Sequence, residues 1–336
     1  MFERKQNLYV LESLDPIHIG TGEFRLGRVD NTIVREPGTN LPKIPGSSIG
    51  GVARAYTAMW VDKYLWKDKE ETRSCAGKGG EDGMKHCGSN QCPVCTTYGF
   101  SRGKQSFQGL AQFGDARILF FPVYSVAGPV WVTCPGSLED AGIQGTDWPE
   151  WNKKLDGGGS PSLAVAGSAN LPDPLNLGWL YLPHHPEKLP AAAEWKLQLG
   201  DQTAVLGETQ YLKAAAERLV LVSDSVFSIL VEDQLEVRTS VSISPDTGAA
   251  ESGALFTSEA IPRACFLFFP VTYLDPKLFR VPVNGGFKPV PVQRDGVDAT
   301  TDDIVNDVKS GLGMLELLGV GGINTRGMGR ARVLGL

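Results

Sequence analysis

The sequence predicts an α+β fold, a modified ferredoxin-like (RRM-like) core that carries several insertions. Three observations lead to this prediction. A strand-like stretch and then an amphipathic helix lie near the start of the chain, apolar strand-like runs fill its middle, and a second amphipathic helix followed by a strand closes it. This order of elements is typical of a split βαβ core.

The first strand and the first helix are predicted from local spacing. Residues 8–14 alternate loosely between apolar and polar side chains, as a strand does. Ser47 and Ser48 carry hydroxyls that are suited to capping a helix. Apolar residues then recur at helical spacing from Ile49, so we expect a helix that runs to about residue 66.

Three segments look like insertions into one domain that spans residues 1–336. Residues 67–95 are charged, rich in glycine and bear cysteines. Apolar strands are expected at 116–133, and the following segment, 136–176, is rich in Gly, Pro and Ser and should be loop-like. Residues 224–256 mix apolar and polar side chains around a turn, which predicts a long hairpin.

The C-terminal helix has a clear start signal. Thr300 and Asp303 stand at the spacing of a capping box, and apolar residues recur on one helical face from Ile304 to Leu318. A glycine-rich loop and a strand at 330–334 close the chain. We therefore expect a helix, a loop and a strand in this order.

Charge and composition exclude several classes of protein. The 336 residues carry a formal net charge of −6, which is the wrong sign for a protein that coats nucleic acid with its whole surface. Any nucleic-acid site should therefore be a local groove. No basic start leads into a long apolar run, and no stretch approaches membrane-spanning length, so we expect a cytoplasmic protein with reduced thiols and no membrane partner.

The glycine-rich loop at 319–330 has two open interpretations. Glycines let backbone amides approach an anion closely, and Arg326 and Arg330 add positive charge. The alternative is a tight turn that needs residues in the left-handed region. A dinucleotide-binding loop is disfavoured, because this loop follows a helix and precedes a strand.

A second anion site is predicted near the first helix. The free amides of a helix start, with Ser47 and Ser48, can hold a phosphate, and Arg54 lies further along the same helix. The simpler alternative makes these serines caps only, and makes His18 a hydrogen-bonded turn residue.

Asp30 is the candidate for chemistry. It lies among Arg25, Arg28 and Arg35, which should keep it ionised and able to assist a metal ion. The alternative is a turn or salt-bridge residue.

Four motifs occur together: His-Ile-Gly-x-Gly at 18–22, Val-Asp-Asn at 29–31, Ile-Pro-Gly-Ser-Ser-x-x-Gly-x-x-Arg at 44–54 and Gly-Gly-x-x-x-x-Gly-x-Gly-Arg at 321–330. In combination they resemble the RAMP superfamily of CRISPR systems. The stretches 113–125, 131–135 and 254–262 further resemble the backbone subunit of the type III-B, or Cmr, effector complex, so that the match spans nearly the whole chain.

The resemblance implies an architecture, partners and an activity. It implies a palm with an inserted finger or zinc region and a long thumb β-hairpin around residues 238–253. Its partners would be a CRISPR RNA guide, a target RNA, further copies of the chain in a filament and other Cmr-type subunits. Its activity would be cleavage of the paired target RNA at regular intervals, with Asp30 in the catalytic position. The implied RNA-binding residues are His18, Lys43, Gly46, Ser47, Ser48, Arg54, Arg238, Gly321, Gly322, Arg326, Gly327, Gly329 and Arg330.

One position departs from the family pattern. Gly50 stands where the family usually has lysine, which removes a phosphate contact, and Lys43 or Arg54 are the candidates to compensate.

The expected chemistry is attack of a ribose 2′-hydroxyl on its own phosphate, which leaves 2′,3′-cyclic phosphate ends. Asp30 would act as general base or would help to hold Mg²⁺ or Mn²⁺. Two alternatives stay open: a purely structural guide-binding filament subunit, and a stand-alone nuclease that processes precursor RNA.

The cysteines are grouped. Cys92 and Cys95 have the two-residue spacing of a zinc knuckle, and Cys75 and Cys87 can complete four thiolates. His86 is a rival ligand, and a set of free thiols is the alternative to a structural zinc ion.

Overall fold

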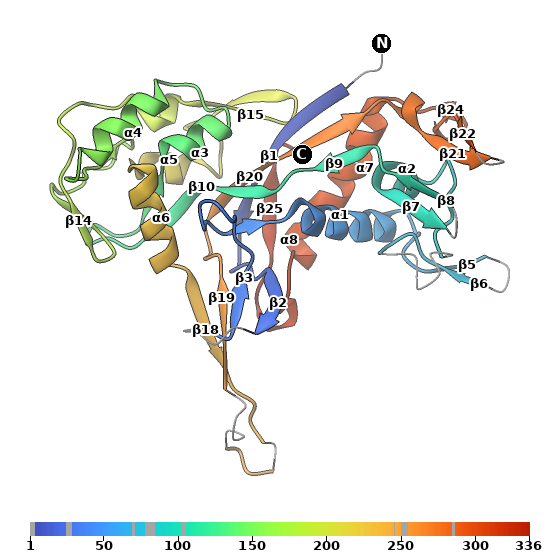
Figure 1. Cartoon of the computed structure of the whole chain (residues 1–336), viewed down its shortest axis with the longest axis horizontal. Coiled ribbons are helices and arrows are strands. Elements are labelled where there is room, and N and C mark those ends of the chain that lie inside the picture. The colour runs from blue at the N-terminus through green and yellow to red at the C-terminus, as the bar shows by residue number, and fades with distance from the viewer. Residues whose placement is uncertain are drawn as a thin grey trace.

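The computed structural model describes residues 4–24, 29–68, 71–77, 85–102, 105–244, 246–249, 255–283 and 286–336. Within these ranges, nine strands form a central sheet in the order β12-β17-β11-β10-β20-β1-β25, with β4 beside β10 and β9 beside β20 (Figure 1). The strands are β1 (Arg4–Ser13), β4 (Lys43–Ile44), β9 (Ala111–Phe113), β10 (Ala116–Val123), β11 (Val130–Thr133), β12 (Ala164–Val165), β17 (Leu219–Leu221), β20 (Phe266–Leu274) and β25 (Ala331–Leu334). The mixed α and β composition predicted from the sequence is confirmed.

The central sheet is buried on both faces, and the alternation of side chains along its strands supplies both cores. On β1, Tyr9 and Leu11 enter one core and Val10 enters the other. On β10, the neighbouring residues Leu119 and Phe120 enter the same core. The pairing register of β10 with β20 shifts at this point, because a β-bulge turns one extra side chain to that face.

Two long helices cover the first face of the sheet: α1 (Gly46–Trp60) and α7 (Thr301–Gly313), which is followed by the short α8 (Leu315–Leu318) (Figure 1). Thr300 and Asp303 form the predicted capping box at the start of α7. The helices pack closely, and the Thr57 hydroxyl donates to Asp307 O at 3.0 Å. Helix α1 is shorter than predicted, because the chain turns away at Asp62 in the left-handed region (φ 55°).

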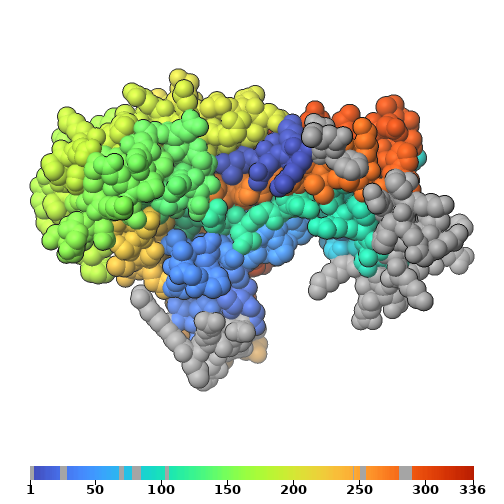
Figure 2. Space-filling view, turned by 45° about the horizontal axis from the view of Figure 1, so that its top comes forward, coloured from blue at the N-terminus to red at the C-terminus, as the bar shows by residue number. Residues whose placement is uncertain are grey.

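The second face is covered by a lobe that the sequence did not predict. Residues 136–176 were expected to be loop-like, but helices α3 (Pro135–Asp140) and α4 (Trp148–Asp156) occupy part of this segment. Trp148 packs edge-on against Trp195 with ring centroids 5.1 Å apart. The expectation failed because helix α4 is a single amphipathic stretch between glycine- and proline-rich flanks. Figure 2 shows this lobe as the green and yellow mass at one end of the molecule.

The predicted hairpin at 224–256 is wrong in its first part. Asp224–Asp233 is helix α6, capped by the Ser223 side chain, and the hairpin follows as β18 (Glu236–Ser240) and β19 (Phe256–Ala260). With β3 (Asn31–Ile33) and β2 (Gly20–Phe24) these strands form a separate sheet in the order β18-β19-β3-β2. The hairpin projects from the body of the molecule (Figure 1). Residues 245 and 250–254 of the expected thumb lie outside the described residues.

Short elements decorate the rest of the chain. They are β5 (Trp66–Asp68), β6 (Glu71–Arg73), α2 (Pro93–Tyr98), β7 (Gly99–Arg102), β8 (Gln105–Gln108), β13 (Leu175–Leu177), β14 (Leu180–Leu182), β15 (Lys196–Leu199), β16 (Gln202–Val205), α5 (Lys213–Glu217), β21 (Arg280–Val283), β22 (Gly286–Pro289), β23 (Gln293–Arg294) and β24 (Val297–Asp298), with single 3₁₀ turns at Ala192–Glu194, Pro276–Leu278 and Asn324–Arg326. Over the ranges that can be described, every helix is too short or too polar to cross a membrane.

Candidate functional site

Asp30 lies just before β3 and is held by a residue of the projecting hairpin. Its carboxylate oxygen Oδ2 accepts hydrogen bonds from the Thr257 backbone N–H at 2.7 Å and from the Thr257 hydroxyl at 2.9 Å. The Asp30 backbone N–H donates in turn to the same hydroxyl at 3.0 Å. The two bonds to the carboxylate lower the pKa of Asp30 below its ordinary value, because they stabilise the charged form.

Arg35, one of the three arginines expected around Asp30, does not explain its ionisation. Arg35 is turned away and forms ion pairs with Glu232 and with Glu259, the latter at 2.7 Å. Arg25 and Arg28 lie outside the described residues. An ionised Asp30 was predicted, and the lowered pKa agrees with it, but among the described residues the cause is the hairpin and not Arg35.

Asp30 itself lines neither of two nearby hollows, but the residue on each side of it in the sequence lines one of them. Asn31 lines an open hollow of about 530 Å³, and Val29 lines a cleft of about 640 Å³. The open hollow is formed by His18, Gly20, Gly22, Asn31, Phe256, Ser258, Gly322, Ile323 and Arg326. Of these described residues Arg326 alone is permanently charged, so this hollow favours an anion.

The larger cleft has the opposite character. Its described lining includes one cation, Arg35, and four carboxylates: Glu36, Glu232, Asp233 and Glu259. A phosphate backbone would meet like charges there. An RNA strand near Asp30 is therefore expected to follow the hollow that contains Arg326.

Segments near the two ends of the polypeptide meet in the open hollow. The Gly322 N–H donates to His18 O at 2.9 Å, and the His18 ring donates from Nδ1 to Glu259 O at 2.6 Å. Gly321 has a φ of +88°, and a Cβ there would collide with His18 O. His18 is only 7% exposed, so its clearest role is to hold the glycine-rich loop.

The arginines of the glycine-rich loop and the hairpin differ in what they contact. Arg326 is exposed and lies over the Phe256 ring, 5.5 Å from its centroid. Arg330 forms two hydrogen bonds with Asp15, at 2.6 and 3.1 Å. Arg238 pairs with Glu236 and donates to Gly327 O at 3.2 Å, which links the hairpin to the loop. Gly329 is buried, and its N–H donates to Pro16 O at 2.9 Å.

The start of α1 differs from the prediction. The helix begins at Gly46, and neither Ser47 nor Ser48 caps it through its side chain. Asp115 takes that place, because it accepts from the Gly46 N–H at 2.8 Å and pairs with Lys43 at 2.6 Å. Burial opposes ionisation of Asp115, but these two donors outweigh it and lower its pKa.

Lys43 and the Gly46 amide are thus already bonded to a carboxylate of the chain. Ser47 is exposed at the helix start, but neither serine is among the described residues that line the hollow of Arg326. Helix α1 still touches the glycine-rich loop further along, where the Tyr56 hydroxyl donates to Gly319 O at 2.7 Å.

The Arg54 side chain does not lie at the predicted anion site either. Its guanidinium donates from Nε to Cys75 O at 2.7 Å and from Nη1 to Tyr98 O at 3.3 Å. The side chain therefore points to the cysteine-bearing segment and not to the helix start. The sequence could not show this, because one helical position leaves several directions open to a long side chain.

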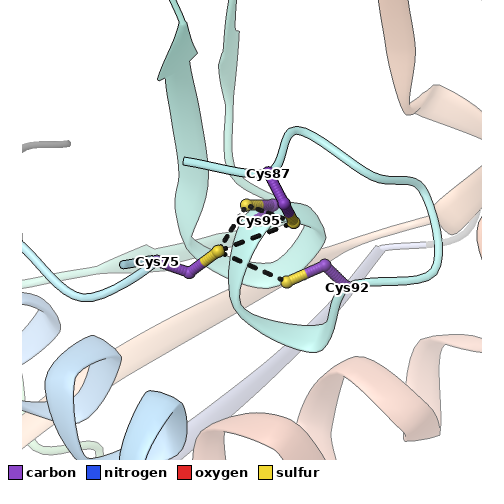
Figure 3. Close-up of side chains that lie close together, drawn as sticks. All are labelled: Cys75, Cys87, Cys92 and Cys95. Carbon is purple, nitrogen blue, oxygen red and sulfur yellow. Dashed lines mark hydrogen bonds between the residues drawn. The ribbon is translucent and has the colours of Figure 1, made fainter. Parts of the chain in front are cut away.

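Four cysteines form a compact cluster (Figure 3). The Sγ atom of Cys75 lies 3.6 Å from that of Cys87, 3.8 Å from that of Cys92 and 3.5 Å from that of Cys95. All four sulfur atoms lie within 4.8 Å of one another, so the cluster can hold a metal ion.

His86 is not part of the cysteine cluster. Its ring nitrogens are used by the Ser101 N–H and by Gly77 O, each at 3.0 Å. Cys134 and Cys265 are buried elsewhere in the core.

A model of the RAMP superfamily matches residues 10–332. The chain belongs to the RAMP superfamily. This RAMP protein is 29% identical over 283 residues to the CRISPR system Cmr endoribonuclease Cmr4 of Pyrococcus furiosus. The aligned region covers 81% of this chain and 83% of the relative.

Solved structures share the fold. The type III-B Cmr-beta complex bound to cognate target RNA contains a chain with a TM-score of 0.58 and 14% identity, with 98% of this RAMP protein and 96% of that chain covered. Oligomeric Cmr4 from Pyrococcus furiosus has a TM-score of 0.53 and 20% identity, with 99% and 100% covered.

Two residues of this RAMP protein contribute to the site without having been singled out from the sequence. Thr257 holds Asp30, and Asp115 occupies the start of α1. Thr257 lies within one of the stretches that resemble the family, but nothing in the sequence connects it to a residue 227 positions earlier.

Proposed function

We propose that this RAMP protein is a CRISPR RNA-binding filament subunit of a type III-B (Cmr) effector complex, and that it cleaves complementary target RNA with Asp30. The observation that carries the proposal is the placement of Asp30. It is an oriented carboxylate beside an anion-favouring hollow in which both ends of the chain meet. The name of the relative, an endoribonuclease of the Cmr system, supports this activity.

The partners follow from the same likeness. A similar fold occurs in an oligomer and in a Cmr complex bound to cognate target RNA. The partners are a guide RNA, a target RNA, further copies of the chain and other Cmr subunits. Arg326 and the glycine-rich loop would contact the guide, whereas Lys43 and Arg54 are engaged within the chain.

The palm and thumb of the proposed architecture have support in the strand order. Strands β10, β20, β1 and β25 are neighbours and pair antiparallel, while α1 lies between β1 and β10 in sequence and α7 lies between β20 and β25. This is the order of a ferredoxin-like palm. The β18–β19 hairpin is the thumb, and the cysteine-bearing segment is the finger.

Cleavage would proceed by attack of the 2′-hydroxyl on the adjacent phosphate and would leave a 2′,3′-cyclic phosphate. Such a reaction depends on holding the nucleotide in line more than on a strong nucleophile. The lowered pKa keeps Asp30 ionised and makes it a weaker base, which favours its role as a ligand of Mg²⁺ or Mn²⁺ over that of a general base. A divalent ion would stabilise the charge that develops on the phosphate.

The cysteine cluster is proposed to bind structural zinc. Four ligands at about 2.3 Å from a tetrahedral zinc ion lie about 3.8 Å from one another. The recorded Sγ to Sγ distances of 3.5–3.8 Å agree with this arrangement. Because four protein ligands leave no open position, the ion would hold the finger in place and take no part in cleavage.

The test is cleavage of guide-matched RNA by the assembled complex. Wild type, Asp30→Ala and Asp30→Asn are compared with Asp298→Ala, which removes an exposed carboxylate on β24. Loss of cleavage in both Asp30 variants, with target binding retained and Asp298→Ala unaffected, supports the proposal. Equal cleavage in all four would make the chain a purely structural filament subunit, and processing of repeat RNA by the isolated chain would make it a stand-alone nuclease.

A further inference from the structure

Thr257 makes three hydrogen bonds with Asp30, two of them to the carboxylate. Both the Thr257 N–H and its hydroxyl donate to Oδ2, at 2.7 and 2.9 Å. The hydroxyl also accepts from the Asp30 N–H at 3.0 Å, so its single proton and one lone pair are both used. This arrangement fixes both the backbone and the carboxylate of Asp30.

No hydrogen bond from a described residue reaches Oδ1, the other carboxylate oxygen of Asp30. Within the part of the chain that the structure describes, both hydrogen bonds to the carboxylate go to Oδ2. A carboxylate oxygen without a protein donor is the one available to a cation or a substrate hydroxyl. Thr257 therefore decides which oxygen is available and where it points.

Thr257 also belongs to a different part of the molecule from Asp30. It lies on β19, the returning strand of the thumb hairpin, whereas Asp30 precedes β3. The two strands pair in parallel at Ser258 and Asn31, and the Asn31 side chain donates to Thr257 O at 3.3 Å. The position of Asp30 therefore depends directly on the position of the thumb hairpin.

We propose that Thr257 is a positioning residue for target cleavage: it holds Asp30 by Oδ2, presents Oδ1 to the reacting nucleotide, and makes cleavage depend on the seating of the thumb. This inference rests on the proposed role of Asp30. Removing the hydroxyl leaves one donor, the backbone N–H, so the carboxylate can turn about its side-chain bonds. Loss of a residue that orients a reactive group is expected to slow the reaction by about 10- to 100-fold.

The experiment uses the assembled complex with guide and target RNA, under single-turnover conditions. Thr257→Val keeps the shape and the backbone N–H but removes the hydroxyl, and Thr257→Ser restores the hydroxyl. Thr203→Val is the matched control, because Thr203 is an exposed threonine on β16, away from the thumb, whose hydroxyl donates to Gln198 Oε1 at 3.0 Å. Target affinity and thermal unfolding are measured for each variant.

We expect Thr257→Val to cleave about 10- to 100-fold more slowly at unchanged target affinity, while Thr257→Ser and Thr203→Val stay close to wild type. In an Asp30→Ala background, adding Thr257→Val should cost nothing further, since Thr257 acts through Asp30.

Several results would overturn the inference. They are a wild-type rate in Thr257→Val, an equal loss in Thr257→Ser, or a further loss in the double variant. If Thr257→Val weakens folding, a normal rate in Thr257→Ser together with a slow Thr257→Ala still tests the hydroxyl, and equal rates in those two variants refute its role. Normal cleavage by Asp30→Ala would instead remove the proposed function itself.

Discussion

Replacing Cys92 with serine removes one of the four sulfur ligands of the proposed zinc site. Cys92 is 4% exposed, and its Sγ lies 3.8 Å from that of Cys75. Structural zinc contributes about 10–16 kcal/mol to the folding of isolated zinc-finger peptides. We therefore expect the variant to lose its ion and the finger to unfold locally while the palm persists.

The matched control is Cys134→Ser. Cys134 is also 4% exposed but lies outside the cluster, where its thiol donates to the Ser137 hydroxyl at 3.3 Å. Both substitutions bury a new hydroxyl, which costs about 1–3 kcal/mol if it stays unpaired. Comparing the two variants therefore separates the loss of the metal from the cost of burying serine.

The measurements are zinc content after dialysis and hydrogen–deuterium exchange. Wild type and Cys134→Ser should carry about one zinc ion per chain, and Cys92→Ser should carry about tenfold less or below. Exchange should rise at 85–102 in Cys92→Ser alone. A wild-type protein that binds neither zinc nor cobalt, or a Cys92→Ser variant that keeps its zinc, would refute the reasoning.

Two further predictions concern charges near the open hollow. Arg326→Ala should weaken guide RNA binding and, in a salt titration, reduce the slope of log affinity against log salt by about one, because one phosphate contact is lost. The control is Lys213→Ala, which removes an exposed cation on α5 and should change neither the affinity nor the slope. An unchanged slope in Arg326→Ala would show that this residue is not part of the RNA site. Hydrogen bonds from Arg330 lower the pKa of Asp15 in the folded protein. The pair therefore stabilises the fold at pH values above about 4, the pKa of Asp15 in the unfolded chain. This stabilisation is lost as pH falls through the lower pKa of Asp15 in the folded protein. Arg330→Met should therefore lower the unfolding free energy only slightly at pH 7, since both side chains are partly exposed. The loss should disappear as pH falls through the lowered pKa of Asp15, which urea denaturation at a series of pH values can show. A loss that persists in acid would point to packing and not to charge.

Local patterns in the sequence predicted the elements whose causes are local. Thr300 and Asp303 lie one helical turn apart, so their capping box forms wherever that helix is placed. The spacing of Cys92 and Cys95 brings both sulfur atoms to one end of a short helix.

Predictions failed where a distant residue competes with a local one. Ser47 and Ser48 have side chains that can cap a helix, but Asp115, which is 69 positions away from Gly46, accepts the hydrogen bond from the helix start instead. Helix α6 replaced the first part of the expected hairpin, because its apolar residues bury against the core and not against a second strand.

The sequence by itself therefore determined the order of the main elements and the grouping of the four cysteines. Only the tertiary structure decided that Arg54 faces the cysteines, that Asp115 occupies the start of α1 and that Thr257 holds Asp30. The physical reason is range: caps and periodicity act within a turn or two of the chain, whereas the partner of an oriented carboxylate is set by how the sheets and helices pack, across 227 positions in the case of Asp30.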